Sequence, residues 1–156
     1  MIDIVKFKGK PFDLGFSKVV TLDSFKVIEG GKSLEENRKM IEKKLDIFLS
    51  PEKNIKKNGL KNLDTGLNHV ICKIAKEKNI AIGFSFSSLL NSDKLELTLA
   101  RMKENIKLCK KYEVKIIIGS FAEDMFEMRM VKDLIVFGNV IGLNNEQTKN
   151  ALNYIK

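Results

Sequence analysis

The chain has 156 residues, the length of one domain, and a chain of this size can bury roughly 70% of its unfolded surface on folding. Its 28 basic and 20 acidic residues give a net charge of +8, which favours an acidic partner, with nucleic acid ahead of a membrane surface. No apolar run approaches the ~20 residues of a membrane span, and no signal-peptide pattern opens the sequence, so a soluble cytoplasmic protein is expected. Two cysteines without CxxC spacing and one histidine exclude a zinc site of the usual kind.

The first part of the chain alternates short β-rich runs with turns. Strands are predicted at residues 2–7, 17–22 and 25–29. Ser33 and Glu36 have the spacing of a capping box, which predicts a helix that ends near Lys44. A short strand at residues 45–49 should then end at Pro51, because proline cannot donate to a strand ladder.

The segment after this strand has no hydrophobic periodicity. Its lysines are Lys53, Lys56, Lys57 and Lys61, and no acid follows them before Asp64. Two interpretations remain open, a mobile basic loop and a merely soluble connector.

From Asp64 to Leu90 the pattern is clearer. Apolar residues spaced by three and four between Leu67 and Ala75 predict a helix, and the run IAIGFSF predicts a strand that is buried on both faces. The opposite side of this helix carries a basic row, His69, Lys73 and Lys76. Such a row suits an anion, although a solvated helix face is the more common explanation.

The second half repeats this helix-to-strand step. A loop at residues 87–91 precedes a long helix, capped by Ser92 or Asp93, whose apolar stripe runs from Leu95 to Tyr112. The remaining predicted elements are a strand at 114–118, a polar loop at 119–129, and helices at 131–143 and 146–155. Loops that follow the carboxyl end of a strand are where α/β folds usually bind ligands.

The order of these elements predicts a single α/β domain over residues 1–156. It resembles a βα barrel but has too few strands for eight units, which need ~250 residues. The sequence contains no G-x-G-x-x-G motif and no complete G-x-x-x-x-G-K-[ST] phosphate loop.

Four segments, in order, carry a family resemblance. They are residues 46–51 (DIFLSP), residues 66–70 and 81–86 (GLNHV and AIGFSF) followed by Leu89-Leu90, residues 111–114 (KYEV), and residues 120–122, 129–134 and 138–143. These segments resemble the archaeal ribonuclease P protein component 3 family, which includes a eukaryotic homologue. The resemblance covers about residues 27–156. Asn68, Val131 and Lys132 depart from the usual aspartate, proline and arginine, and the front of the chain is shorter than in the family.

The resemblance implies a TIM-barrel-like fold related to the polymerase and histidinol phosphatase phosphoesterases, shortened at the N-terminus and either closed or incomplete. It also implies a protein subunit of ribonuclease P, the ribonucleoprotein that removes the 5′ leader from precursor tRNA. The RNA and its Mg²⁺ ions would perform the cleavage, and the protein would bind no cofactor. It would stabilise the catalytic domain of the RNA together with protein component 2, as a heterotetramer.

Matching the family's basic RNA-facing positions to this chain gives Arg38, His69, Lys78, Lys111, Arg129 and Lys149. Helical geometry adds Lys73 and Lys76. Arg129 is the strongest candidate, since a guanidinium can grip phosphate with two hydrogen bonds. The alternative for Arg129 is an ion pair with Asp124, Glu127 or Asp133.

Apolar residues in the loop after the last strand suggest a surface for a protein partner. They are Phe121, Met125, Phe126, Met128 and Met130.

Two other functions are weighed against RNA binding. A small metal-dependent phosphoesterase could use Asp64, His69, Glu123 and Asp124, but the sequence has no H-x-H pair. The last two helices could form a DNA-reading helix-turn-helix, although their apolar content fits packing better.

Overall fold

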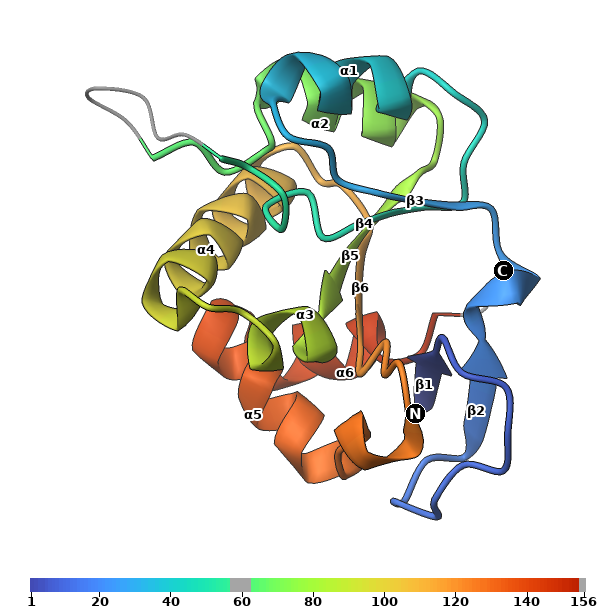
Figure 1. Ribbon diagram of the computed structural model, residues 1–156. Coiled ribbons are helices and arrows are strands. Elements are labelled where there is room, and N and C mark those ends of the chain that lie inside the picture. Colours follow the sequence, from blue (N-terminus) through green and yellow to red (C-terminus); the bar gives the residue numbers. More distant parts are fainter. Residues whose placement is uncertain (57–62, 155–156) are drawn as a thin grey trace.

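The computed structural model describes residues 1–56 and 63–154, which form parallel strands surrounded by helices (Figure 1). A four-stranded sheet has the order β3-β4-β5-β6, and a smaller sheet pairs β1 with β2. The strands are β1 (Ile2–Val5), β2 (Lys18–Thr21), β3 (Val27–Glu29), β4 (Ile47–Leu49), β5 (Ala81–Ser85) and β6 (Ile116–Gly119). In register, Ile47 lies beside Ala81 and Ile82 lies beside Ile116.

The two sheets meet where β1 lies beside the end of β6. The backbone N–H of Phe121 donates to the carbonyl of Ile4 at 2.8 Å, and that of Lys6 donates to Ala122 at 2.8 Å. The buried carboxylate of Asp3 accepts hydrogen bonds from the N–H of Ser120 at 2.7 Å and from its hydroxyl at 2.6 Å. The spatial order is therefore β2-β1-β6-β5-β4-β3, a curved wall of six parallel strands.

Residues of each strand alternate between the inside and the outside of this wall, as the period of two requires. Ile47 and Leu49 of β4 pack inward against Ile4, Ile117 and Phe121. Outward-facing strand residues, such as Phe48 of β4, pack under the helices instead.

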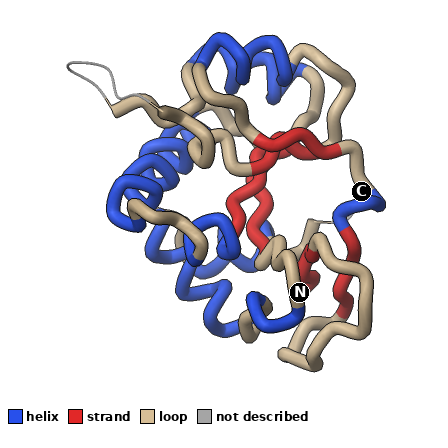
Figure 2. Tube along the Cα trace, in the orientation of Figure 1, coloured by secondary structure: helices blue, strands red, loops and turns tan. Residues whose placement is uncertain are grey.

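Helices cover the outer face of the wall (Figure 2). They are α1 (Leu34–Ile41), α2 (His69–Glu77), α3 (Phe86–Leu90), α4 (Leu95–Lys111), α5 (Val131–Ile141) and α6 (Asn145–Ala151), with 3-10 turns η1 (Leu22–Ser24) and η2 (Met125–Glu127). Cys72 and Cys109 are buried between these helices and the strands, with free thiols, as expected. None of the described helices combines the length and the apolar character needed to cross a membrane.

The predicted barrel-like α/β fold is confirmed, and the wall is incomplete. Within residues 1–56 and 63–154, no strand ladder joins β2 to β3. Side chains of Leu22 and Phe25, from the connection between these strands, pack into the interior at this gap. The described part is thus an open barrel with six strands rather than eight.

Several predicted elements differ locally from the structure. Residues 86–90 form the short helix α3 instead of a loop, because the hydroxyl of Ser85 caps the N–H of Ser88 at 3.0 Å. Leu95 is exposed, since it begins α4 outside the core, and no side chain caps this helix. Ser33 does cap α1, but Glu36 accepts from the N–H of Lys32 and the helix ends at Ile41.

The predicted basic loop is described only in part. Lys53 and Lys56 are exposed, whereas Lys57 and Lys61 lie outside the described residues.

Candidate functional site

Lysines gather where the helices α1, α2 and α4 turn into the neighbouring strands β4, β5 and β6. These αβ turns precede β4, β5 and β6, which are parallel neighbours in one sheet. The turns therefore lie together at the amino ends of the strands. We call this surface the αβ-turn face; its cationic residues are Lys43, Lys44, Lys78, Lys110, Lys111 and Lys115. All six are exposed. Each of the first five also lies near the end of a helix, where a cation is stabilised by the helix dipole.

Contacts between the turns hold this face together. Lys78 Nζ, after α2, donates to the carbonyl of Glu42 at the end of α1. Lys76 Nζ, in the last turn of α2, lies 2.9 Å from a carboxylate oxygen of Glu113, before β6. A hollow of about 300 Å³ separates the first two turns and is lined by Lys43, Lys44 and Lys78. The three turns therefore form one continuous basic surface at the amino ends of the strands.

The predicted RNA-binding residues divide among several surfaces. Lys76, Lys78 and Lys111 lie at or beside the αβ-turn face. Arg38, His69 and Lys73 are exposed on the outer sides of α1 and α2. Lys149 is exposed on α6, a helix whose Gln147 and Asn150 line a hollow of about 400 Å³ together with Lys110 and Lys115.

Arg129 lies at the opposite end of the strands, beyond β6. Its guanidinium donates to the carbonyls of Phe126 at 3.0 Å and Met128 at 2.8 Å, and it stacks 5.3 Å from the ring centre of Phe86. In the part of the chain that the structure describes, no carboxylate lies within 4 Å of it. Arg129 thus stabilises its own loop and forms no ion pair with Asp124, Glu127 or Asp133 in the described structure.

The predicted partner-binding loop is wrong at two positions. Phe121 is fully buried, because its backbone adopts a positive φ of 45° beside β1 and its ring enters the barrel interior. Met128 is also buried, against Val5 and Ala122. Met125 is half-buried. Phe126 is 77% exposed and Met130 is 52% exposed, so these two remain candidates for a partner surface.

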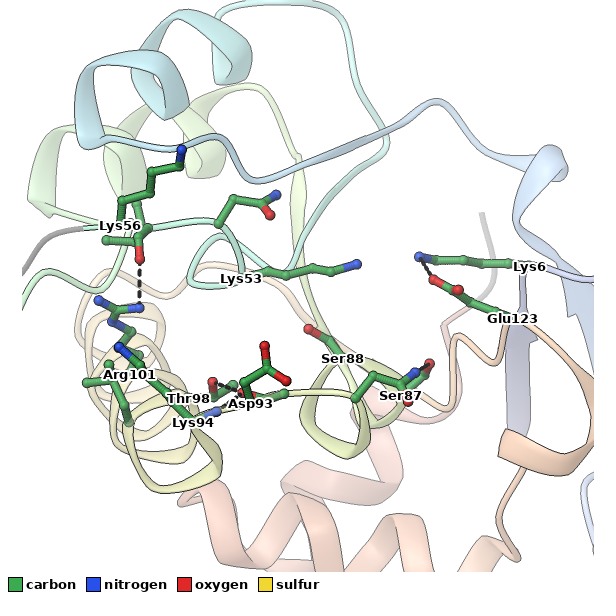
Figure 3. Close-up of a pocket in the computed structure, with 15 residues that line it drawn as sticks. Lys6, Lys53, Lys56, Ser87, Ser88, Asp93, Lys94, Thr98, Arg101 and Glu123 are labelled. Carbon is green, nitrogen blue, oxygen red and sulfur yellow. Dashed lines mark hydrogen bonds and ion pairs between the residues drawn. The ribbon is translucent and has the colours of Figure 1, made fainter.

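The end of the barrel opposite the αβ-turn face holds a polar cleft of about 610 Å³ (Figure 3). It opens at the carboxyl ends of the strands, between the segment that follows β4 and the helices α3 and α4. Lys6 and Glu123 lie at one end of the cleft, and Arg101 and Lys56 lie at the other. Ser87 and Ser88 of α3 form part of the wall between them.

Internal contacts fix both ends of this cleft. Lys6 Nζ contacts Glu29 at 2.5 Å and Glu123 at 3.3 Å, and Lys53 Nζ contacts Glu29 at 3.3 Å. Burial lowers the pKa of Arg101, against the opposing effect of nearby carboxylates, and its guanidinium donates to the carbonyl of Ile55 at 3.0 Å.

The wall formed by α3 is anchored by one carboxylate. Glu127 accepts hydrogen bonds from Ser87 Oγ at 2.5 Å and from Asn91 Nδ2 at 2.6 Å. Burial raises the pKa of Glu127, but these hydrogen bonds outweigh that effect and leave its pKa below the ordinary value. Glu127 therefore stays ionised and holds α3 in place.

The residues of the alternative metal site are separately engaged. Asp64 accepts from the N–H of Gly66 at 3.1 Å, Asp124 caps η2, Glu123 contacts Lys6, and His69 is exposed. Among residues 1–56 and 63–154, no three His, Cys, Asp or Glu side chains are grouped so that they could hold one metal ion.

Sequence reasoning missed Lys43, Lys44, Lys110 and Lys115 on the αβ-turn face, as well as the cleft. A usable signal exists for these four lysines, because each stands shortly before a predicted strand or at its start, and those strands are neighbours in one sheet. The cleft has no such signal, since its residues come from segments far apart in the sequence.

Comparisons with known proteins identify relatives of this chain. Residues 30–155 match the family model of RNase P subunit p30. The chain is 33% identical over 147 residues to ribonuclease P protein component 3 of Thermococcus gammatolerans, covering 93% of this chain and 65% of that protein. It is 35% identical over 118 residues to the Methanocaldococcus jannaschii protein of the same name, covering 74% of this chain and 47% of that protein.

A solved structure supports the same relationship. The cryo-EM structure of archaeal ribonuclease P with mature tRNA includes a chain that is 31% identical to this one, with a TM-score of 0.66 over 81% of this chain and 52% of that chain. The present chain therefore spans about half to two thirds of the length of these relatives. Because the matched region includes β4, β5, β6 and all six α-helices, the chain belongs to the RNase P subunit p30 family.

Proposed function

We propose that this chain is a protein subunit of ribonuclease P, the ribonucleoprotein that removes the 5′ leader from precursor tRNA. In this role it binds and stabilises the catalytic domain of the RNA together with protein component 2, in a heterotetramer. The RNA and its Mg²⁺ ions perform the cleavage. The chain supplies binding surfaces and no cofactor.

The observation that carries this proposal is the αβ-turn face, a basic surface on a chain that belongs to the RNase P subunit p30 family. Six exposed lysines on one edge suit the phosphate backbone of a folded RNA, because phosphate contacts supply much of protein–nucleic acid affinity. The exposed basic residues Lys76, Arg38, Lys73 and Lys149 of α1, α2 and α6 add further phosphate contacts. Arg129, on the far side of the barrel, is then a loop-forming residue whose substitution affects RNA binding less than that of the face lysines.

The experiment is cleavage of precursor tRNA by the cognate RNA with the other protein subunits, titrated over Mg²⁺. Adding this chain should lower the Mg²⁺ concentration needed for half-maximal cleavage. A Lys43→Gln, Lys78→Gln, Lys111→Gln chain should raise it again and should reduce the salt dependence of RNA binding, by up to about three phosphate contacts.

The matched control removes three charges elsewhere, with Lys8→Gln, Lys10→Gln and Lys132→Gln. All three are exposed lysines away from the αβ-turn face. If the control variant loses as much activity as the face variant, net charge rather than this face is responsible. Cleavage that is indifferent to the chain at every Mg²⁺ concentration would contradict the proposed function.

Component 2 is proposed to bind the exposed apolar surface at the end of the 119–130 loop. Phe126 meets Phe12 edge to face, with ring centres 6.2 Å apart, and Met130 is exposed nearby in the sequence. A Phe126→Ala, Met130→Ala chain should bind component 2 at least tenfold more weakly, since exposed aromatic anchors often dominate interfaces. Val136→Ala, at another exposed apolar position, is the control. Equal binding by both chains would place the interface elsewhere.

A further inference from the structure

The cleft at the carboxyl ends of the strands is separate from the αβ-turn face, which lies at their amino ends. Its charge is unbalanced: the described lining residues include five cationic and two acidic side chains. The cationic ones are Lys6, Lys53, Lys56, Lys94 and Arg101, and the acidic ones are Asp93 and Glu123. The remaining lining residues are mostly hydroxyl and amide side chains.

The two ends of the cleft differ in charge compensation. At one end, Lys6 and Lys53 are neutralised by Glu29 and Glu123. At the other end, neither Lys56 nor Lys94 has a carboxylate within 4 Å anywhere in the described ranges. Two ammonium groups without a carboxylate partner beside a concave surface favour an anion.

Two further features point the same way. The start of α4, a helix of 17 residues, has no side-chain cap, and its first turn contributes Lys94, Leu97 and Thr98 to the cleft. Uncapped N–H groups and the helix dipole attract negative charge. In the wall formed by α3, Ser88 Oγ is shielded from solvent yet has no hydrogen-bond partner among the described residues. Its hydroxyl can rotate toward a ligand without breaking any existing bond.

The lining also limits the kind of ligand. A volume of about 610 Å³ is within the range of small-molecule sites. Its described residues include no aromatic side chain, so no platform for stacking a nucleobase is present in that part of the chain. Hydroxyl, amide and carboxylate groups suit a polyol instead.

We propose that this cleft binds a ribose phosphate group, with the phosphate between Lys56, Lys94 and the start of α4. The sugar hydroxyls face Ser88 and the charge-balanced Lys6–Glu123 end. The group can belong to a free sugar phosphate or to an RNA strand, and the site stands independently of the proposed function.

The test is a titration of the ¹⁵N-labelled full chain with ribose 5-phosphate, followed by NMR. Saturable amide shifts are expected at residues 87–98 and at Lys53, with ribose alone producing none. Lys56→Gln, Lys94→Gln should weaken binding by roughly three- to tenfold per lysine, the range expected for an exposed to partly buried charged contact.

The control is Lys103→Gln, Lys107→Gln, which removes the same charge from the exposed side of α4. Unchanged backbone spectra verify that both variants fold. Equal affinity of the two variants, equal shifts with ribose, or shifts outside the cleft would each overturn the proposal.

Competition by short RNAs identifies the source of the group. Displacement of ribose 5-phosphate only by a 5′-phosphorylated RNA assigns an RNA end, and displacement by 5′-hydroxyl RNA as well assigns a backbone phosphate. Absence of displacement by either assigns a free sugar phosphate. These three outcomes all require the cleft site and are independent of precursor tRNA cleavage.

Discussion

Glu52 is a carboxyl group enclosed under the basic segment that follows β4. Burial raises its pKa from 4.5 to about 7, although a hydrogen bond from Asn105 Nδ2 at 3.4 Å and the charge of Arg101 oppose this. Its other oxygen has no partner among the described residues. Because the unfolded chain ionises near pH 4.5, the folded state binds the additional proton between pH 4.5 and 7, and stability falls as pH rises through this window.

At the residue scale, Glu52→Gln should remove this pH dependence. As pH rises from 4.5 to 7, the free energy of unfolding of the variant should increase relative to that of the parent chain, by on the order of 3 kcal/mol at most. Urea denaturation at several pH values measures this difference. Glu96→Gln, at an exposed position on α4, is the control and should track the parent chain. A Glu52→Gln curve parallel to the parent curve would refute the assignment.

At the scale of elements, α5 and α6 pack without space for a side chain at their crossing. A Cβ atom added at Gly138 would lie 2.3 Å from Thr148 Cγ2 and 2.6 Å from its Oγ1. The same threonine hydroxyl donates to the carbonyl of Asn144 at 2.8 Å, so it cannot move freely.

Gly138→Ala should therefore destabilise the fold by about 1–3 kcal/mol, despite the better helix propensity of alanine. Thermal denaturation measures the loss, and Val136→Ala on the exposed side of α5 should change little. In a Thr148→Ala background, which removes the crowding atoms, the cost of Gly138→Ala should shrink. A cost that is the same in both backgrounds would mean that helix packing at this crossing is not responsible.

At the scale of the whole molecule, Asp3 and Ser120 help to attach the small sheet to the large one, beside the backbone hydrogen bonds of Phe121 and Lys6. Burial raises the pKa of Asp3, and the hydrogen bonds from Ser120 and Ile4 oppose that rise. Replacing the carboxylate leaves three buried donors without an acceptor, at about 1–3 kcal/mol for each unsatisfied group.

Asp3→Ala should therefore loosen β1 and β2 selectively. Native-state hydrogen exchange should show faster exchange of the amides of Ile4 and Val19, while those of Ile82 and Phe84 in β5 keep more of their protection. Asp13→Ala, at an exposed position in the front loop, is the control. Uniform loss of protection across both sheets would show that they unfold as a single unit.

The parts predicted correctly from the sequence are those in which one local pattern decides the structure. The run from Ala81 to Phe84 is apolar throughout because both faces of β5 are buried, and Asn144 caps α6 with a complete capping box. α3 was missed because five residues are too few to display a helical period. Phe121 and Met128 were misplaced because their burial depends on pairing with β1, which the local sequence cannot reveal.

The candidate sites show the same limit. Individual lysines were identified, yet their grouping into one face depends on the order of β4, β5 and β6 in the sheet. The cleft depends on contacts such as that between Lys6 and Glu123, which are 117 positions apart.

The position of β1 between β2 and β6 also has a consequence for synthesis on the ribosome. All four residues of β1 are buried in the finished fold, but the edge that receives them emerges 117 residues later. At about 5–20 residues per second, the nascent chain holds this apolar strand without its second neighbour for roughly ten seconds. During that interval β2 protects only one edge of β1, so the other edge is open to chaperones or to a second nascent chain.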